Sequence, residues 1–299
     1  MRTTIALLCI AFLTPSSNAN DWTTWRADSA RSGYTSDALP AKLARSWSWH
    51  PAHAPSPAWP RDNRMSFDRA HHVVVAAGLV CFGSSVDGRV TALDAKSGDA
   101  KWTFFTAGPV RFAPTVWKDR LFVVSDDGFL YAIKLLDGTL IKRWRGSRGA
   151  EQVLGNTKMI SKWPARGGVV IHNGVLYWGA GIWQSEGVFL HAMNPDTGEI
   201  VWTNDSSGGI YMPQPHGGAK AKSGVSAQGY LLANKDRLFV PTGRAVPAAF
   251  TRSNGKFDYY RLQENTKRGD TAAMLAGDLV YNGGYAYKAS DGSLHADRI

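Results

Sequence analysis

Short apolar runs separated by turn residues recur along most of the chain after residue 70. Five of these runs hold the same place in a repeating unit, at residues 79–82, 121–124, 175–178, 238–240 and 279–281. Another apolar run precedes each of the first four, at residues 73–75, 114–117, 169–172 and 230–232. No long window shows the i, i+3, i+4, i+7 spacing of an amphipathic helix. The pattern therefore predicts an all-β chain built from short strands.

A short motif follows each of the five runs. It consists of an alanine, a large apolar residue, four further residues and a glycine, and in three copies a tryptophan comes after it. The motif positions are Ala92, Asp94, Gly98 and Trp102; Ala132, Gly138 and Trp144; Ala192, Asn194, Gly198 and Trp202; Ala249 and Gly255; Ala286 and Gly292. The tryptophan comes four residues after the glycine in the first and third copies, and two residues later than that at Trp144.

The spacing of the motif sets the size of the unit. Successive glycines are separated by 40, 60, 57 and 37 residues, so the unit has about 40 residues, with insertions near 145–165 and 203–226. Four short strands in such a unit, with a glycine and an aromatic residue at fixed points, are typical of a β-propeller blade. The glycine suits a turn that needs a positive φ angle. We expect the tryptophan, on the outer strand, to wedge between neighbouring blades.

The first 19 residues differ from the rest of the chain. A positive start at Met1-Arg2, an apolar run at residues 5–13 and the small residues Ser17 and Ala19 are typical of a secretory signal peptide, with cleavage before Asn20. We therefore divide the chain into a signal peptide at 1–19, an N-terminal segment at 20–69 and propeller repeats at 70–299. Cleavage leaves Cys81 as the sole cysteine, so the exported chain would contain no internal disulfide. Cys81 lies in an apolar strand and is expected to be buried and inert.

Composition narrows the classes of protein further. With 44% hydrophobic residues, 12 Trp and 19% charged residues, the chain of 299 residues is too apolar for a disordered protein. No apolar stretch reaches the roughly 18 residues of a membrane-spanning helix. The net charge of +10 favours an anionic partner, but the basic residues are scattered, and we expect no nucleic-acid binding.

The motif from Ala92 to Trp102, ALDAKSGDAKW, resembles the tryptophan-docking repeat of pyrroloquinoline quinone (PQQ) propellers, and the copy from Ala192 to Trp202 matches it with Asn194 in place of the aspartate. The segment from Asp21 to Trp49 resembles the strand that begins such chains and closes their ring. The resemblance implies an all-β propeller of PQQ-like four-stranded blades. Family propellers usually close with seven or eight blades, so about five motif copies predict an incomplete one.

The family that the motif resembles mixes quinoprotein dehydrogenases with scaffolds, one branch of which assists outer-membrane protein assembly in the bacterial periplasm. The dehydrogenases resemble one another in a calcium site built from Glu, Asn and Asp near the quinone. The four glutamates of this chain, Glu151, Glu186, Glu199 and Glu264, suggest no such cluster, and neither a vicinal cysteine pair nor a haem attachment motif is present. The resemblance therefore leaves PQQ as a possible cofactor and makes calcium unlikely.

Arginines recur at one place in the repeat. Counting ten residues back from the leucine of the apolar run gives Arg69, Arg111 and Arg166 in the first three units, then Gln228 and Gly269. If the register holds, the three arginines ring one mouth of the central channel and bind a carboxylated ligand such as PQQ, which is a tricarboxylate. The alternative is that they are solvated loop arginines of a basic protein.

Two other candidate sites have simple structural explanations. The adjacent residues His71 and His72, near Asp68, would point to opposite faces of a strand and so could not easily share a metal ion. The glycine- and lysine-rich stretch at 217–224 lacks the spacing of a phosphate-binding loop and is expected to be an insertion.

Three function classes remain open. The first is an exported scaffold, periplasmic or extracellular, that binds a protein partner or a carboxylated small ligand and is not an enzyme. The second is a PQQ-dependent dehydrogenase, or an N-terminal fragment of one, that oxidises an alcohol or a sugar. The third is a degenerate propeller whose role depends on a fused domain beyond residue 299.

Overall fold

Five four-stranded antiparallel sheets follow one another along the chain in this computed structural model, each with its strands in sequence order. The structure describes residues 20–61, 65–155, 157–214, 218–243, 245–261 and 269–297. The predicted signal peptide, Glu264 and the last two residues lie outside these ranges. The all-β fold and the propeller blades predicted from the repeat are confirmed.

The blades are numbered 1 to 5 from their strands. Blade 1 has β1 (Val74–Ala76), β2 (Leu79–Gly83), β3 (Arg89–Asp94) and β4 (Ala100–Phe105), and blade 2 has β5 (Thr115–Trp117), β6 (Arg120–Val124), β7 (Phe129–Lys134) and β8 (Leu140–Arg145). Blade 3 has β11 (Ala165–His172), β12 (Val175–Ala180), β13 (Phe189–Met193) and β14 (Ile200–Asn204). Blade 4 has β17 (Leu232–Ala233), β18 (Arg237–Val240), β19 (Ala248–Thr251) and β20 (Phe257–Tyr259). Blade 5 has β21 (Ala273–Ala276), β22 (Leu279–Asn282), β23 (Tyr285–Lys288) and β24 (Leu294–Asp297).

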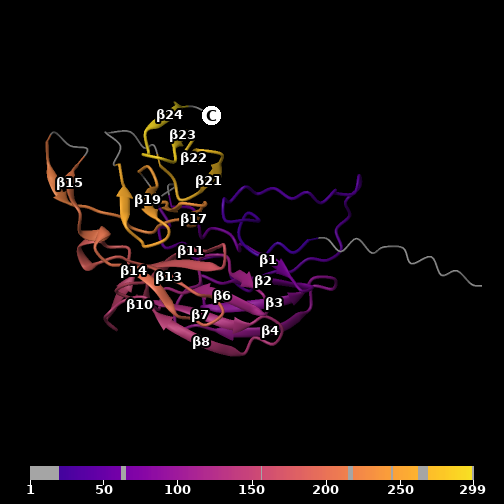
Figure 1. Cartoon of the computed structure of the whole chain (residues 1–299). Helices are drawn as coiled ribbons and strands as arrows, with labels where there is room; N and C mark the ends of the chain where they lie inside the picture. The colour runs from indigo at the N-terminus through magenta and orange to yellow at the C-terminus, as the bar shows by residue number, and fades with distance from the viewer. Residues whose placement is uncertain are drawn as a thin grey trace, which may run out of the picture.

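The first strands of successive blades lie side by side, so these are the innermost strands of an arc. Figure 1 shows the blades following one another around this arc, from β1 to the last blade, which is drawn in yellow. The middle strands of each sheet carry most of the buried residues, and the core runs between blades without a break from Phe67 to Tyr230. Cys81 is buried in it, and burial raises the pKa of its thiol to about 12.

The motif forms the turn between the third and fourth strands. In blade 1, the Asp94 carboxylate accepts bonds from the backbone N–H of Lys96 and Ser97, and Gly98 ends the turn at φ +78°. The glycine also allows close approach of an aromatic ring. A Cβ at Gly138, for example, would lie 2.7 Å from Cε3 of Trp102.

Aromatic side chains link the N-terminal segment to blade 1 and each blade to the next one. The indoles of Trp47, Trp102 and Trp202 donate to the carbonyl three residues before the next turn glycine, at Ala95 (3.0 Å), Leu135 (2.9 Å) and Arg252 (2.9 Å). In blade 4 the Tyr259 hydroxyl takes this role and donates to Ala289 at 3.1 Å. Trp144, which comes two residues late in its repeat, instead donates to the carbonyl of Gly198 itself at 3.1 Å.

The two insertions predicted from the repeat spacing each contain a two-stranded hairpin. The first pairs β9 (Gln152–Gly155) with β10 (Lys158–Ser161), and the second pairs β15 (Tyr211–Pro213) with β16 (Lys220–Lys222). Two short 3-10 helices, Gln184–Glu186 and Ser207–Gly209, lie in connecting segments. Both hairpins stand between the last strand of one blade and the first strand of the next, and β15 projects from the arc in Figure 1.

The segment after residue 20 runs along the inner side of the arc. Backbone bonds join Trp22 to Val75 in β1, Thr23 to Val116 in β5, Ser29 to Ala233 in β17, and Ala30 to Leu275 in β21. Trp22 and Val75 form an isolated bridge, and the described part of 20–69 contains no longer strand. The closing of a complete ring by this segment stays a prediction.

Arg31 bonds this segment to blade 3, which the backbone bonds named above do not reach. Its Nη2 donates to the carbonyl of Val169 in β11 at 2.9 Å, and its Nε donates to that of Leu231 at 2.9 Å. Nη1 donates to Thr24 and to the Trp25 carbonyl, so the fully buried guanidinium meets oxygens from three parts of the chain. Burial lowers the pKa of Arg31 to about 10, which still leaves it protonated at neutral pH.

Candidate functional site

A buried network of charged side chains lies where the inner strands of blades 1 to 3 begin. Arg111, which precedes β5, contacts Asp126 in the turn after β6 and Asp68 in the segment before β1, each at 2.6 Å. Arg166 in β11 meets the two oxygens of Asp126 through Nε and Nη2, both at 2.9 Å. All four side chains are at most 3% exposed. Asp126 thus bridges two arginines from neighbouring blades.

The network holds equal numbers of positive and negative groups. Burial alone would raise the pKa of Asp126, but the attraction and hydrogen bonds of Arg166 and Arg111 outweigh it and hold that pKa below its ordinary value. Burial would lower the pKa of the Arg111 guanidinium, but the Asp126 and Asp68 carboxylates outweigh burial and raise it. The Asp126 carboxylate and the Arg111 guanidinium are therefore each held in the ionised form by groups of opposite sign.

The N-terminal segment covers this network. The carbonyl of Ser56 accepts a bond from Arg111 Nη1 at 2.7 Å, and the backbone N–H of Ala58 donates to Asp68 at 2.7 Å. The buried side-chain atoms without a hydrogen-bond partner in the described residues include Arg166 Nη1 and Asp68 Oδ1 of this network, and Gln228 Oε1. One of these is a donor and two are acceptors.

The structure brings two of the three predicted arginines together. Arg111 and Arg166 both bond Asp126. Gln228, which holds the same repeat position in the fourth unit, is buried and precedes β17. Arg69, however, is exposed, with Nη2 at 3.5 Å from the carbonyl of Pro60, and its neighbour Asp68 joins the network instead. Asp68 and Arg69 lie in a turn in which the backbone N–H of Arg69 bonds the carbonyl of Ser66, so the strand spacing does not determine which of the two side chains faces inward.

Sequence reasoning missed both carboxylates. Asp126 lies in the Ser-Asp-Asp-Gly turn between β6 and β7, and its sequence context is that of an ordinary turn residue. The sequence relates Asp68 only to the two histidines that follow it. The two histidines precede β1 and contact different partners, so they do not share a site. His71 Nδ1 lies 3.1 Å from the carbonyl of Gly83, whereas His72 Nε2 lies 2.8 Å from that of Phe67.

The network does not fit PQQ. A tricarboxylate needs an excess of positive groups, and here both guanidiniums already face carboxylates. The unpartnered Asp68 Oδ1 of this network is an acceptor that would repel a carboxylate rather than bind it. Carboxylate binding by Arg69, Arg111 and Arg166 stays a prediction. Within the ranges that the structure describes, no three His, Cys, Asp or Glu side chains converge as ligands for a metal ion.

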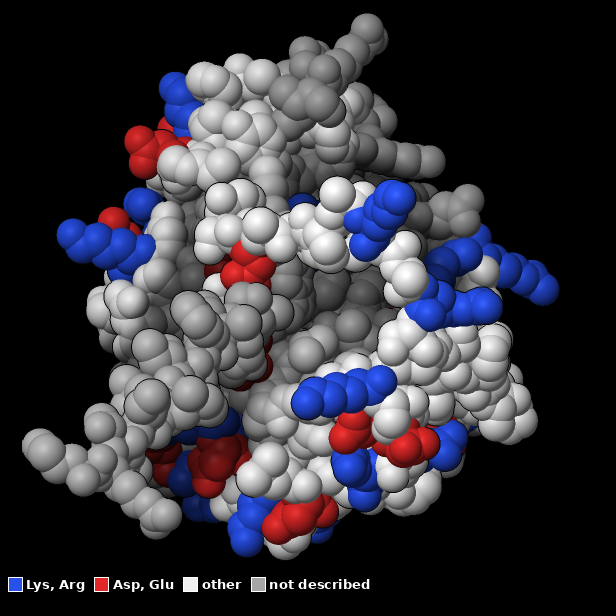
Figure 2. Space-filling view, turned by 90° about the vertical axis from the view of Figure 1, so that its right-hand side faces the viewer, with Lys and Arg blue, Asp and Glu red and all other residues white. Residues whose placement is uncertain are grey.

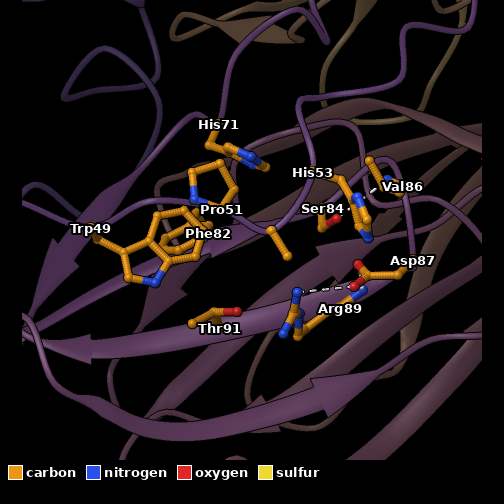
Figure 3. A pocket seen from close by; sticks show the side chains of 11 residues that line it. Trp49, Pro51, His53, His71, Phe82, Ser84, Val86, Asp87, Arg89 and Thr91 are labelled. Atoms are coloured by element: carbon orange, nitrogen blue, oxygen red, sulfur yellow. Dashed lines mark hydrogen bonds and ion pairs between the residues drawn. The ribbon is translucent and has the colours of Figure 1, made fainter.

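Two pockets lie on blade 1, away from this network. One lies between the N-terminal segment and strands β2 and β3. In Figure 3, Trp49, Phe82 and His71 lie on one side of it, and Arg89 pairs with Asp87 at 3.0 Å on the other. Its volume of about 10 Å³ suits a single water molecule. The other has a volume of about 270 Å³ and lies between residues 106–109 and the hairpin residues Lys158 and Met159.

The exposed face shown in Figure 2 is hollowed near its centre, and positive and negative side chains are interspersed around the hollow. No single sign of charge covers this face, in agreement with the scattered basic residues of the sequence. In the described part of the chain, no helix has the length and apolar character needed to cross a membrane.

Comparisons with known proteins agree with this fold. The structure resembles quinohemoprotein alcohol dehydrogenase from Comamonas testosteroni at TM-score 0.65 and 16% identity, over 92% of this chain and 48% of that one. A second quinohemoprotein alcohol dehydrogenase, from Pseudomonas putida, gives TM-score 0.54 and 15% identity over 75% of this chain and 41% of that one. BamB from Moraxella catarrhalis gives TM-score 0.41 and 14% identity over 73% and 72% of the two chains.

At such identities, the structural likeness shows the fold alone. The chain spans about half the length of the first dehydrogenase that it matches. Comparison with curated protein sequences gives no significant match. A family model described as outer membrane protein assembly factor BamB, however, matches residues 16–292. The chain therefore belongs to this PQQ-like propeller family.

Proposed function

We propose that this chain is an exported binding scaffold that serves the assembly of outer-membrane proteins through contacts with protein partners. Support for this role comes from the family model, which carries that description and matches nearly all of the chain after the predicted signal peptide. Export to the periplasm is part of the proposal. It is supported by the charged start, apolar run and small residues of 1–19.

The observation that carries the scaffold proposal is the state of the inner arginines. In a PQQ-dependent dehydrogenase we would expect positive groups at the axis to be available to the quinone carboxylates. Here Arg111 and Arg166 share Asp126, and Ser56 and Ala58 of the N-terminal segment bond to the same network. The axis is therefore better suited to holding blades together than to holding a trianionic cofactor.

The alternative is a PQQ-dependent dehydrogenase. The buried, unpartnered Nη1 of Arg166 favours it, because a buried donor without a partner can bind a carboxylate. A PQQ titration of the chain from Asn20 onward, with and without calcium, separates the two functions through tryptophan fluorescence. N-acetyltryptophanamide at the same absorbance corrects for light absorbed by the quinone.

The scaffold function predicts no saturable quenching at micromolar PQQ from protein that circular dichroism shows to be folded. Saturable quenching that Arg166→Gln abolishes would overturn the scaffold proposal in favour of the dehydrogenase. In a second experiment, the immobilised chain is exposed to solubilised outer membranes. Enrichment of outer-membrane assembly proteins, relative to a heat-unfolded sample of the same chain, is the expected result.

A further inference from the structure

The outer strand of blade 2 differs from the other outer strands in its charge. Strand β8 reads Leu-Ile-Lys-Arg-Trp-Arg, and all of its residues except Trp144 are exposed. The other outer strands, β4, β14, β20 and β24, contain a single lysine among them and no arginine. The basic residues of the five outer strands, which form the rim of the arc, are therefore concentrated on β8.

Strand β8 also has a free edge. It pairs with β7 on one side and is the last strand of its sheet, so its other side bonds no strand in the described part of the chain. Figure 1 shows it on the outside of the arc. Such an edge presents a row of backbone donors and acceptors to which a further extended segment can pair.

The three basic side chains of β8 have no acidic partner in the part of the chain that the structure describes. Elsewhere on the surface, Lys101 pairs with Asp94 and Arg237 with Asp258. Among the described residues, Lys142, Arg143 and Arg145 form no ion pair. Their positive charge is therefore available to a ligand.

Two of these side chains are held in place by an aromatic ring. The guanidiniums of Arg143 and Arg145 lie 4.6 and 4.5 Å from the centre of the Phe129 ring. Arg145 pairs in register with Phe129 and Arg143 with Tyr131, so the two arginines are alternate residues on one face of the sheet. Alternate residues of a strand are separated by roughly 7 Å, the distance between alternate side chains of a strand added alongside.

We propose that the edge of β8 binds an extended, acidic segment of a partner protein, which adds a fifth strand to blade 2. Backbone bonds form along the free edge, and carboxylates at alternate positions of the segment meet Arg143 and Arg145. This inference rests on the proposed scaffold function and specifies the chemistry of a partner. A lipid headgroup would neutralise the charge but would leave the row of backbone groups without partners, so the free edge favours a peptide.

The test uses the chain from Asn20 onward and a dye-labelled peptide of alternating glutamate and valine, with binding measured by fluorescence anisotropy. We expect saturable binding that weakens between 50 and 200 mM salt, about the range over which surface charges become screened. Combining Lys142→Glu, Arg143→Glu and Arg145→Glu should weaken it by about tenfold or more. A matched control combines Lys96→Glu, Lys220→Glu and Lys222→Glu, which changes the net charge equally at exposed sites elsewhere. It should weaken binding by less than about threefold.

Strand pairing has a separate test. Two peptides methylated at alternate backbone nitrogens, in opposite phases, block opposite edges of an added strand. One of them should lose binding and the other should keep it. Equal binding of both, equal weakening by the two triple variants, or tighter binding to phosphatidylglycerol vesicles than to the peptide would overturn the proposal. If one of these results were found while the chain still captured outer-membrane assembly proteins, the β8 proposal would be wrong but the scaffold function would remain supported.

Discussion

The arginines of the inner strands and those of the outer rim experience opposite surroundings. Arg111 and Arg166 are buried and share the Asp126 carboxylate, and their Nε–oxygen distances to it are 2.6 and 2.9 Å. Arg143 and Arg145 on β8 are exposed and lie against a phenyl ring. The inner pair therefore connects blades, whereas the outer pair keeps its charge available to other molecules.

The difference shows why net charge alone does not locate a binding surface. The chain carries a formal charge of +10, but part of its positive charge is neutralised internally at the axis. Exposed charges in water interact weakly when single and more strongly when several act together on one ligand. A strand with three unpaired basic residues is thus a better candidate for anion binding than a larger number of paired ones.

Removal of Asp126 should have the largest effect on the free energy of unfolding, and it tests whether the inner arginines connect the blades. Asp126→Ala leaves Arg111 with Asp68 alone and Arg166 without a carboxylate, both buried. We expect a loss of about 4 kcal/mol in the free energy of unfolding, because removing one partner leaves a buried charge uncompensated. Urea unfolding followed by tryptophan fluorescence measures it.

Asp119→Ala is the matched control, since the Asp119 side chain is 77% exposed and lies 3.8 Å from Arg120. It should change the free energy of unfolding by less than about 0.5 kcal/mol. If the two variants were equally stable, the inner network would not connect the blades, and its arginines would again be candidates for ligand binding.

The next largest effect is expected at Arg31, which is buried like the inner pair but meets only uncharged oxygens. Arg31→Met leaves the carbonyls of Val169, Leu231 and Trp25 without this donor. Unsatisfied buried acceptors are costly, and removal of a desolvated charge offsets part of the loss, so we expect about 3 kcal/mol.

Limited proteolysis identifies where the effect of Arg31→Met arises. Cleavage within residues 20–33 should become faster before the blades are cut, because the variant releases this segment from the inner strands. The half-exposed Arg26 serves as the control, and Arg26→Met should cost less than about 1 kcal/mol, since its observed contact is with the Trp25 ring. Uniform cleavage throughout Arg31→Met protein would contradict a local role.

Much of the propeller could be predicted from local sequence. Turn chemistry and a fixed glycine position are short-range signals, so five blades and both insertions followed from the repeat alone. The path of residues 21–33 could not be predicted in this way, because the hydrogen bonds that hold this segment join residues far apart in the chain. Arg31 and Leu231, for example, are 200 positions apart. Nothing in the sequence near Arg31 indicates which carbonyls it meets.

The site was predicted less well, for a physical reason that Arg69 illustrates. The repeat count placed Arg111 and Arg166 at one level, and the structure brings them together. The count gave Arg69, but Asp68 is the residue that bonds Arg111, because residues 66–69 form a turn whose side-chain directions a strand repeat does not predict. The count also could not reveal that Asp126 lies between the two arginines, because that carboxylate comes from a turn of another strand pair.

A smaller effect is expected at the rim, where Trp102 links blade 1 to blade 2. Trp102→Phe keeps an aromatic ring against Gly138 but loses the indole bond to the Leu135 carbonyl. We expect a loss of about 1 kcal/mol in urea unfolding, the usual net contribution of such a bond. Trp117→Phe is the control, because its indole bonds the exposed Asp196, and it should cost less than about 0.5 kcal/mol. The Trp117 bond also joins two blades but is exposed, so equal losses would show that burial of the Trp102 bond does not increase its contribution.

An effect of similar size, seen only as the pH changes, is expected at His191, which bonds the residue after β8. His191 lies in β13, with Nδ1 at 2.9 Å from the Thr203 hydroxyl and Nε2 at 2.9 Å from the carbonyl of Gly146, the residue that follows β8. A carbonyl only accepts, so Nε2 carries the proton and Nδ1 accepts from Thr203. Burial lowers the pKa of His191, which therefore stays neutral when the unfolded chain begins to bind protons.

Because the folded pKa is below the unfolded value of about 6.5, the stability from neutral His191 is complete above that value and decreases as the pH falls below it. Between pH 7.5 and 5 we expect wild type to lose about 1 kcal/mol more than His191→Gln, whose side chain does not titrate. Urea unfolding at a series of pH values measures the difference between the two curves, which removes the contribution of other histidines such as His72. Parallel curves would show that His191 is exposed to solvent. The end of β8 would then be held by Arg145 and its neighbours alone.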